Sequence, residues 1–404
     1  MTKKLIILAL CLVLTAFAVS NLTACDSKGL EYLLLDNDTY AVIGIGECED
    51  LDIVIPSEHE GKKVTVIDEK AFEGCDEITS ITIPDTVTDI MDFAFAGCEA
   101  LVTVTIPDSI KTIRSYAFNG CDKLTVVNIT DLAAWCDIYF YDQTSNPVYF
   151  AHKLYLNDES VNELVIPDGV KEIPRNAFVG FNRLTGITLP DSVTKIGSNA
   201  FSGCTRLETV TLSESLVDLG INVFEDCKKL TYTEYENGNY LGSRTNPYFL
   251  LASVTKSAST PTVHPDTKVL GDSVFKDLDT LTEITLPEGL VAIGPSAFNN
   301  CAKLTSVTLG SSVKTVGIMA FMFCSSLETV TLPDGLETIG ASAFYWCGRL
   351  SRIVIPNSVT TVSREAFSNC STLSIFCEAA EQPEGFDEAW NSSNRPVEWG
   401  YQGK

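Results

Sequence analysis

The stretch LTSVTLGSSVKTVGIMAFMFC, residues 304–324, holds two short runs in which apolar and polar residues alternate, followed by Gly317 and an Ala-Phe pair. Alternation with a period of two is typical of strands that bury one face. The segment from Gly317 to Cys324 suits a single turn of α-helix or 3₁₀-helix. We therefore expect one coil of chain with two short strands and one helical turn.

The same pattern recurs in register along the chain at intervals of 23 residues. A single coil of this size cannot bury its own leucine, valine and phenylalanine side chains, so neighbouring coils must stack to bury them. The sequence therefore predicts a solenoid, a stack of coils with short parallel strands and a cap at each end. The phenylalanine of the pattern falls at Phe72, Phe95, Phe118, Phe178, Phe201, Phe224, Phe275, Phe298, Phe321, Phe344 and Phe367.

Written as L-x-x-I/V-x-I/L-P-x-x-V-x-x-I-G-x-x-A-F-x-x-C, the repeat resembles the BspA-like leucine-rich repeat family of bacterial and some protist surface proteins. The resemblance covers roughly residues 50–376. It implies a leucine-rich repeat solenoid, a curved right-handed stack exposed outside the cell, in a family associated with adhesion and with the binding of host or neighbouring-cell proteins. It implies no catalytic residue, because the motif of the family is architectural.

Two inserts interrupt the register, since Phe118 and Phe178 lie 60 residues apart and Phe224 and Phe275 lie 51 residues apart. We expect these inserts to divide the solenoid into three blocks without breaking its core. The predicted organisation is a lipoprotein signal peptide (1–24), an anchor and N-terminal cap (25–66), repeat block one (67–127), a first insert (128–163), block two (164–230), a second insert (231–263), block three (264–376) and a C-terminal cap (377–404).

The N-terminus has the layout of an export signal. Lys3 and Lys4 precede an apolar run, 5–19, that is too short to span a bilayer. Residues 22–25, Leu-Thr-Ala-Cys, resemble a bacterial lipobox, in which the cysteine is diacylated and becomes the new N-terminus. The alternative is an ordinary cleaved signal with a chance cysteine. The sequence predicts a protein lipid-anchored through Cys25 to the outer face of a bacterial membrane.

The two ends differ from the repeats, as caps should. Residues 30–48 alternate around the turn Asp36-Asn37-Asp38, which indicates a hairpin over the first coil. Near the C-terminus, Trp390 and Trp399 are expected to close the apolar face of the last coil. An alternative role for these two tryptophans is carbohydrate binding.

The inserts carry their own local signals. In the first insert, Asp131 is expected to cap a short helix with Trp135 facing inward, and residues 154–158 to form one arm of a hairpin. Both inserts also contain an Asn-Pro pair before an aromatic residue, at Asn146 and Asn246, which reads as a turn that leads into a strand.

Aromatic residues in the inserts are the candidate partner-binding residues. Insertions in repeat proteins project from one face and often form the binding surface. Aromatic side chains are enriched where proteins bind one another. The alternative is that these rings only cover an open strand edge or coil. The candidates are Tyr139, Phe140, Tyr141, Tyr149, Phe150, Tyr248 and Phe249.

Nine cysteines occupy one repeat position. Side chains stacked in successive coils point in parallel, so a disulfide between them would be strained. Two coils have Phe181 and Leu278 at this position, and neither residue binds metal or forms a disulfide. We therefore expect buried, small hydrophobic groups. The nine are Cys75, Cys98, Cys121, Cys204, Cys227, Cys301, Cys324, Cys347 and Cys370.

Signals for chemistry are scarce. The chain has three histidines in unrelated segments and none of the motifs H-E-x-x-H, G-x-S-x-G, G-x-x-x-x-G-K-S/T or C-x-x-C. We expect no enzyme, no cofactor and no resident metal. An exported hydrolase built from carboxylates on distant coils is an alternative. Another is weak Ca²⁺ binding by a column of acids after the turn prolines, at Asp85, Asp108, Asp168, Asp191, Glu288 and Asp334.

The net charge of −25 decides between classes of partner. It repels phosphate backbones, so we expect no nucleic acid. The partners that remain are a protein or other macromolecule at the cell surface, and the membrane through the lipid at Cys25. A structural envelope protein with no dedicated ligand is the alternative function.

Overall fold

The computed structural model describes residues 26–255 and 261–403. The predicted signal peptide and the predicted lipidation site, Cys25, lie outside the described residues. Within the described ranges, no helix is both long enough and apolar enough to cross a membrane.

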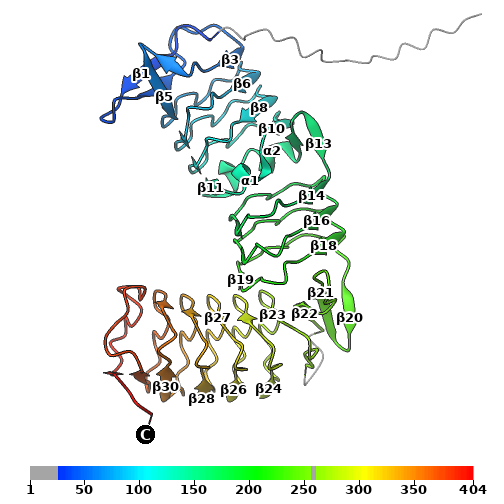
Figure 1. Cartoon of the computed structure of the whole chain (residues 1–404), viewed down its shortest axis with the longest axis vertical. Helices are drawn as coiled ribbons and strands as arrows, with labels where there is room; N and C mark the ends of the chain where they lie inside the picture. The colour runs from blue at the N-terminus through cyan, green and yellow to red at the C-terminus, as the bar shows by residue number, and fades with distance from the viewer. Residues whose placement is uncertain (1–25, 256–260, 404) are drawn as a thin grey trace, which may run out of the picture.

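The chain forms the predicted leucine-rich repeat solenoid, with about 15 turns (Figure 1). Each regular coil contributes one strand to a long-strand ladder and one to a short-strand ladder. Both ladders are parallel and shift by one repeat per coil, so that Ser306 pairs with Glu283 on one side and with Thr329 on the other. The repeat pattern of the sequence therefore fixes the strand register.

The long-strand ladder has strands of three or four residues. These are β3 (Asp52–Val54), β6 (Ser80–Thr82), β8 (Thr103–Ile106), β10 (Val126–Ile129), β14 (Glu163–Val165), β16 (Gly186–Thr188), β18 (Thr209–Thr211), β24 (Glu283–Thr285), β26 (Ser306–Thr308), β28 (Thr329–Thr331), β30 (Arg352–Ile355) and β32 (Ser374–Cys377).

The short-strand ladder has strands of two residues and lies on the inner side of the bend in Figure 1. It consists of β7 (Asp89–Ile90), β9 (Thr112–Ile113), β11 (Tyr139–Phe140), β15 (Glu172–Ile173), β17 (Lys195–Ile196), β19 (Asp218–Leu219), β23 (Val269–Leu270), β25 (Ala292–Ile293), β27 (Thr315–Val316), β29 (Thr338–Ile339) and β31 (Thr361–Val362).

The predicted helical turn of each coil is wrong. The segment from Gly317 to Cys324 forms hydrogen-bonded turns without a helix. The physical reason is that two of its residues, Met319 and Phe323, have positive φ angles of 55° and 61°. A residue in the left-handed region cannot continue a right-handed helix. Alternate N–H groups donate to the next coil instead, as Phe321 N does to Ala343 O at 2.8 Å.

The repeat phenylalanines form the centre of the core. Neighbouring rings stack, and the ring centroids of Phe298 and Phe321 lie 5.0 Å apart with an interplanar angle of 4°. Ten of the eleven rings are fully buried, and Phe224 alone among them is partly exposed. The stack is interrupted on the C-terminal side of Phe224, where the second insert begins.

The repeat cysteines are buried beside these rings, apart from Cys75, which is half-buried. Their thiols are free and do more than fill space, because eight of them donate a hydrogen bond to the phenylalanine carbonyl of the preceding coil. One example is Cys324, whose Sγ lies 3.1 Å from the carbonyl oxygen of Phe298. The prediction of small buried groups is therefore correct, with a polar contact that the sequence did not reveal.

This burial predicts how the thiols react. Desolvation raises the pKa of Cys121 and of Cys227 to about 12, so neither forms a thiolate near neutral pH. In the folded protein we expect a disulfide reagent to label two thiols, Cys48 and Cys75, which are the half-buried ones. After unfolding without reductant, all twelve cysteines of residues 26–403 should react. Fewer than twelve would contradict the free thiols.

The N-terminal cap is the predicted hairpin. Its strands β1 (Glu31–Leu34) and β2 (Tyr40–Gly44) are antiparallel, and β2 pairs in parallel with β5 (Lys62–Ile67), which in turn pairs with β4 (Glu58–His59). The hairpin therefore starts the short-strand ladder.

At the other end, β33 (Val397–Trp399) adds to β32, and Trp390 packs edge-on against Phe367 at 6.1 Å between ring centroids. Trp390 is 4% exposed and Trp399 packs against the same core cluster, so the two tryptophans close the last coil as predicted.

The first insert replaces one coil and keeps the core continuous. Asp131 caps helix α1 (Leu132–Trp135), and the indole of the buried Trp135 donates to Ala177 O at 3.0 Å. The predicted hairpin is present, since Leu154 pairs with Val161 in an antiparallel register. The strand predicted after Asn146 is wrong, because the turn leads into a helix. The remaining elements of this insert are η1 (Gln143–Ser145), α2 (Val148–Ala151), β12 (Leu154–Leu156) and β13 (Glu159–Val161).

The second insert breaks the core, contrary to expectation. It forms an antiparallel sheet of β20 (Thr233–Tyr235), β21 (Gly238–Leu241) and β22 (Leu250–Val254), with the predicted turn at Asn246 before β22. Successive side chains of a strand point to opposite faces. Leu250 therefore joins one core cluster and Leu251 the other. The axis of the solenoid turns sharply at these strands (Figure 1).

Candidate binding site on the concave face

The bend at the second insert forms a concave cleft between blocks two and three. The cleft has a volume of about 430 Å³ and is lined by the short strands of both blocks. Lys195 and Asp218 come from block two, and Thr315 and Thr338 from block three. Tyr139, from the first insert, also lines the cleft. Three segments distant in sequence thus share one hollow.

Glycines form the floor of this cleft. Gly197 and Gly220 in block two, and Gly317 and Gly340 in block three, all line it. A Cβ atom at Gly220 would lie 2.3 Å from the backbone nitrogen of Ser198, and one at Gly340 would lie 2.6 Å from the carbonyl carbon of Gly317. The coils approach this closely on the inner side because these positions carry no side chain.

Charged side chains alternate along the wall from block two. Glu172, Lys195 and Asp218 face one another in register on adjacent strands. The ammonium of Lys195 lies 3.1 Å from a carboxylate oxygen of Glu172. Burial raises the pKa of Asp218, and the nearby Lys195 opposes that rise. The wall therefore presents charges of both signs. Such a surface is better suited to hydrogen bonding with a polypeptide than to the binding of a single ion.

An aromatic stripe lies partly on block one and partly on the first insert. We define it as Phe93, Tyr116, Tyr141 and Tyr139. The rings of Phe93 and Tyr116 stack with centroids 5.1 Å apart, and those of Tyr141 and Tyr139 meet edge-on at 5.0 Å. The guanidinium of Arg114 lies 5.2 Å from the ring centroid of Tyr141. Tyr139 is the member of the stripe that also lines the cleft.

The seven predicted aromatic residues separate into three groups by their exposure. Tyr139 and Tyr141 are 49% and 38% exposed, and both belong to the stripe. Phe140 and Phe249 are buried in the core. Their prediction as partner-binding residues is therefore wrong, because a ring with no accessible surface cannot contact a partner.

The other three predicted rings are partly buried and cover neighbouring structure. The rings of Tyr149 and Phe150 pack edge-on at 5.2 Å. Tyr248 stacks on His264 with centroids 3.7 Å apart. These contacts match the alternative that some insert rings only cover a coil.

Four aromatic residues outside the inserts were not predicted from the sequence, of which Phe93 is partly buried and the other three are exposed. Phe93 and Tyr116 in the stripe, and Phe323 and Trp346 in block three, all adopt positive φ angles. At the same two coil positions other repeats have asparagine or glycine, which tolerate such angles. A bulky ring at a position that favours asparagine or glycine is the signal that identifies them.

The acidic column offers no metal cluster within the described ranges, where no group of three or more histidine, cysteine, aspartate or glutamate residues lies close enough to hold an ion. Two of its members accept hydrogen bonds from neighbouring coils instead. Asp108 accepts from the hydroxyl of Thr130, and Asp191 accepts from the backbone N–H of Glu214 at 3.1 Å.

The fold and the cleft together define a repeat scaffold with an extended concave surface. Comparison with known families identifies which one. The family model described as "BspA type Leucine rich repeat region (6 copies)" matches residues 52–150, 148–256 and 253–374. The chain belongs to this family, which is typically non-enzymatic.

Solved structures of similar proteins include a leucine rich cell surface protein from Faecalibacterium prausnitzii A2-165, with 25% identity over 96% of this chain and 97% of that one, at a TM-score of 0.42. A leucine-rich repeat protein from Bacteroides ovatus ATCC 8483 has 26% identity over 93% and 98%, at a TM-score of 0.43. The leucine rich repeat protein of T. pallidum has 25% identity over 51% and 90%, at a TM-score of 0.37. No curated protein matches the chain.

Proposed function

We propose that this chain is a non-enzymatic lipoprotein of the bacterial cell surface that binds a protein or other macromolecule, in adhesion or another cell-surface interaction. The observation that carries the proposal is that the exposed ring of Tyr139 belongs both to the aromatic stripe and to the lining of the concave cleft. Interfaces are enriched in tyrosine and arginine, and a few such anchors dominate their energetics. Export and anchoring rest on the signal pattern that ends at Cys25.

A cleft residue provides the test of binding. We expect Tyr139→Ala to weaken the affinity for a purified partner about tenfold, or about 1.4 kcal/mol, because the variant removes an exposed ring at the mouth of the cleft. To obtain the partner, the fragment of residues 26–404 is added to neighbouring cells and crosslinked to the molecule that it binds, which is then purified. Affinity is measured by surface plasmon resonance.

The matched control is Tyr155→Ala, in the same insert but on β12, which belongs to the other ladder. Equal affinities for Tyr139→Ala and the unaltered protein would show that the cleft is not the binding surface. Absence of any saturable partner would favour the structural envelope protein.

The anchor has a separate test. We expect Cys25→Ser to move the protein from the membrane fraction to the soluble fraction, because stable anchoring needs the acyl chains that lipoprotein processing attaches to this cysteine. Fractionation and metabolic labelling with palmitate follow the change. A variant that stays on the membrane after a high-salt wash would refute lipid anchoring at Cys25.

A further inference from the structure

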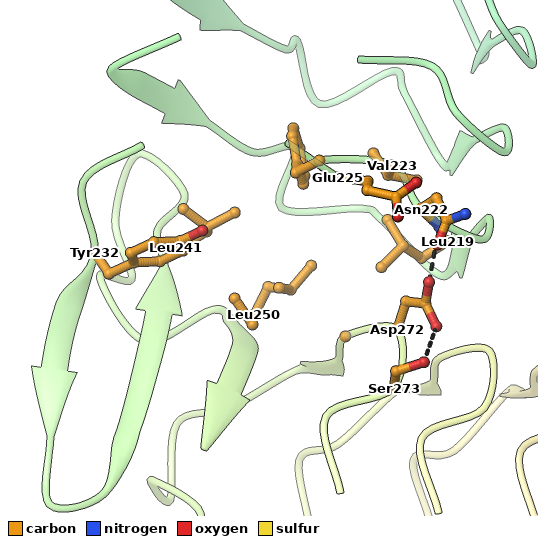
Figure 2. Close-up of a pocket in the computed structure, with 12 residues that line it drawn as sticks. Leu219, Asn222, Val223, Glu225, Tyr232, Leu241, Leu250, Asp272 and Ser273 are labelled. Carbon is orange, nitrogen blue, oxygen red and sulfur yellow. Dashed lines mark hydrogen bonds between the residues drawn. The ribbon is translucent and has the colours of Figure 1, made fainter. Parts of the chain in front are cut away.

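A second pocket lies where block two meets the second insert (Figure 2). Its volume is about 270 Å³. Figure 2 shows Leu250 between Tyr232 and Leu241 on one side and Leu219 and Asp272 on the other. The pocket exists because the antiparallel strands of the insert replace the coil that would otherwise stack on block two. It is a different site from the concave cleft, with which it shares only Leu219.

The pocket exposes one face of the Phe224 ring. The repeat phenylalanines of the other coils are fully buried. The ring of Phe224 stacks on Phe201 at 5.7 Å between centroids, and within the described part of the chain no ring stacks on its other side. Phe224 lines the pocket and is the one partly exposed member of the repeat phenylalanines. A ligand in the pocket therefore has an aromatic surface to cover.

Backbone donors are also left open at this junction. In the preceding coil, the N–H groups of Phe201 and Gly203 donate to carbonyl oxygens of the next coil at 3.0 and 2.8 Å. The corresponding N–H groups of Phe224 and Asp226 have no acceptor within residues 26–255 and 261–403. They belong to the face on which a following coil would stack, so they suit the carbonyl groups of an incoming chain.

The charge of the pocket is negative and unpaired. Asp272 and Glu225 line it, and none of its twelve lining residues is basic. The carboxylate of Asp272 accepts from Asn222 N and from the hydroxyl of Ser273, each at 2.7 Å. A carboxylate offers about four acceptor sites, so Asp272 retains capacity for a cation. Neither acid forms an ion pair with any described residue.

We propose that this pocket binds an arginine within an extended segment of a protein partner. The guanidinium stacks on the open face of Phe224 and donates to Asp272, the aliphatic stem lies against Leu219 and Leu250, and the peptide carbonyls accept from the open N–H groups. Arginine fits better than lysine because its planar group both stacks on rings and forms paired bonds to carboxylates. The net charge of −25 favours the approach of a basic segment.

The test compares two capped tripeptides, acetyl-Gly-Arg-Gly-amide and the same peptide with citrulline, which is neutral and nearly identical in shape. By calorimetry at low salt we expect the arginine peptide to bind about tenfold more tightly, and this preference to fall as salt is added. No detectable heat at about 10 mM peptide, or equal binding of the two peptides, would overturn the proposal.

Variants locate the binding. Asp272→Asn keeps an acceptor for the backbone N–H of Asn222. It should reduce the affinity for the arginine peptide to the affinity for the citrulline peptide. Ala252→Leu should fill the pocket and abolish binding of both. The control Asp279→Asn removes an exposed carboxylate outside the pocket and should change nothing. Unaltered binding by Asp272→Asn would overturn the proposal. Tyr139 does not line this pocket, so a failure here is distinct from a failure of the proposed cleft function.

Discussion

Replacement of Phe321 by alanine is expected to destabilise block three by about 3–5 kcal/mol, the range for a fully buried phenylalanine. The ring is inaccessible to solvent and stacks on Phe298 at 5.0 Å and on Phe344 at 5.3 Å. Its loss leaves a cavity between two coils and removes both ring contacts, each worth about 0.5–1.5 kcal/mol. The backbone carbonyl that accepts from Cys347 remains, so the variant tests the ring and not the thiol contact.

The matched variant is Phe224→Ala. Phe224 occupies the same position of its coil as Phe321 and lines the pocket between block two and the second insert. Its ring is partly exposed and stacks on one side, so we expect about half the cost or less. Urea unfolding followed by circular dichroism measures both variants. Hydrogen exchange shows whether the amides of block three lose protection first, as expected for a repeat protein in which each coil contacts only its neighbours. Equal costs for the two variants would contradict the unequal burial.

The regular coils were predictable because the solenoid repeats one solution of local packing. The spacing of the phenylalanines fixed which strands pair, and the substitution of cysteine by Phe181 and Leu278 favoured a packing role for the cysteines, which are free and mostly buried. Apolar periodicity wrongly predicted a helical turn in each coil, because it does not reveal the backbone conformation that replaces that turn. That conformation depends on the sign of φ at residues such as Met319, and that sign is visible only when the asparagines and glycines of the other coils are compared.

The exposure of the aromatic residues in the inserts was predicted in part. Tyr139 and Tyr141 were identified because they lie in an insert, and Phe140, the residue between them, is buried because neighbouring side chains of a strand alternate in direction. The cleft itself was not predictable. It needs residues of block two and block three to face each other, and that geometry follows from the turn of the axis at β20 to β22, for which the repeat pattern holds no information.

The glycines on the floor of the cleft give the second large effect. Gly340→Ala is expected to destabilise the protein by about 3 kcal/mol, the upper part of the range for overpacking a well-packed interior. The new Cβ atom would lie 2.6 Å from both the carbonyl carbon of Gly317 and the backbone nitrogen of Ile318. These are backbone atoms that cannot rotate away, so the coils themselves must separate on the inner side. The separation should also widen the floor of the cleft.

Gly348→Ala is the control, eight residues further along the chain. A Cβ atom there meets nothing within 4 Å, and the residue does not have a positive φ angle. Its only expected effect is on the unfolded chain, a stabilisation of about 0.4–1 kcal/mol. Thermal unfolding should therefore shift in opposite directions for the two variants. If Gly340→Ala unfolds at the same temperature as the unaltered protein, the close approach of the coils does not depend on glycine, and another cause must hold the concave face together.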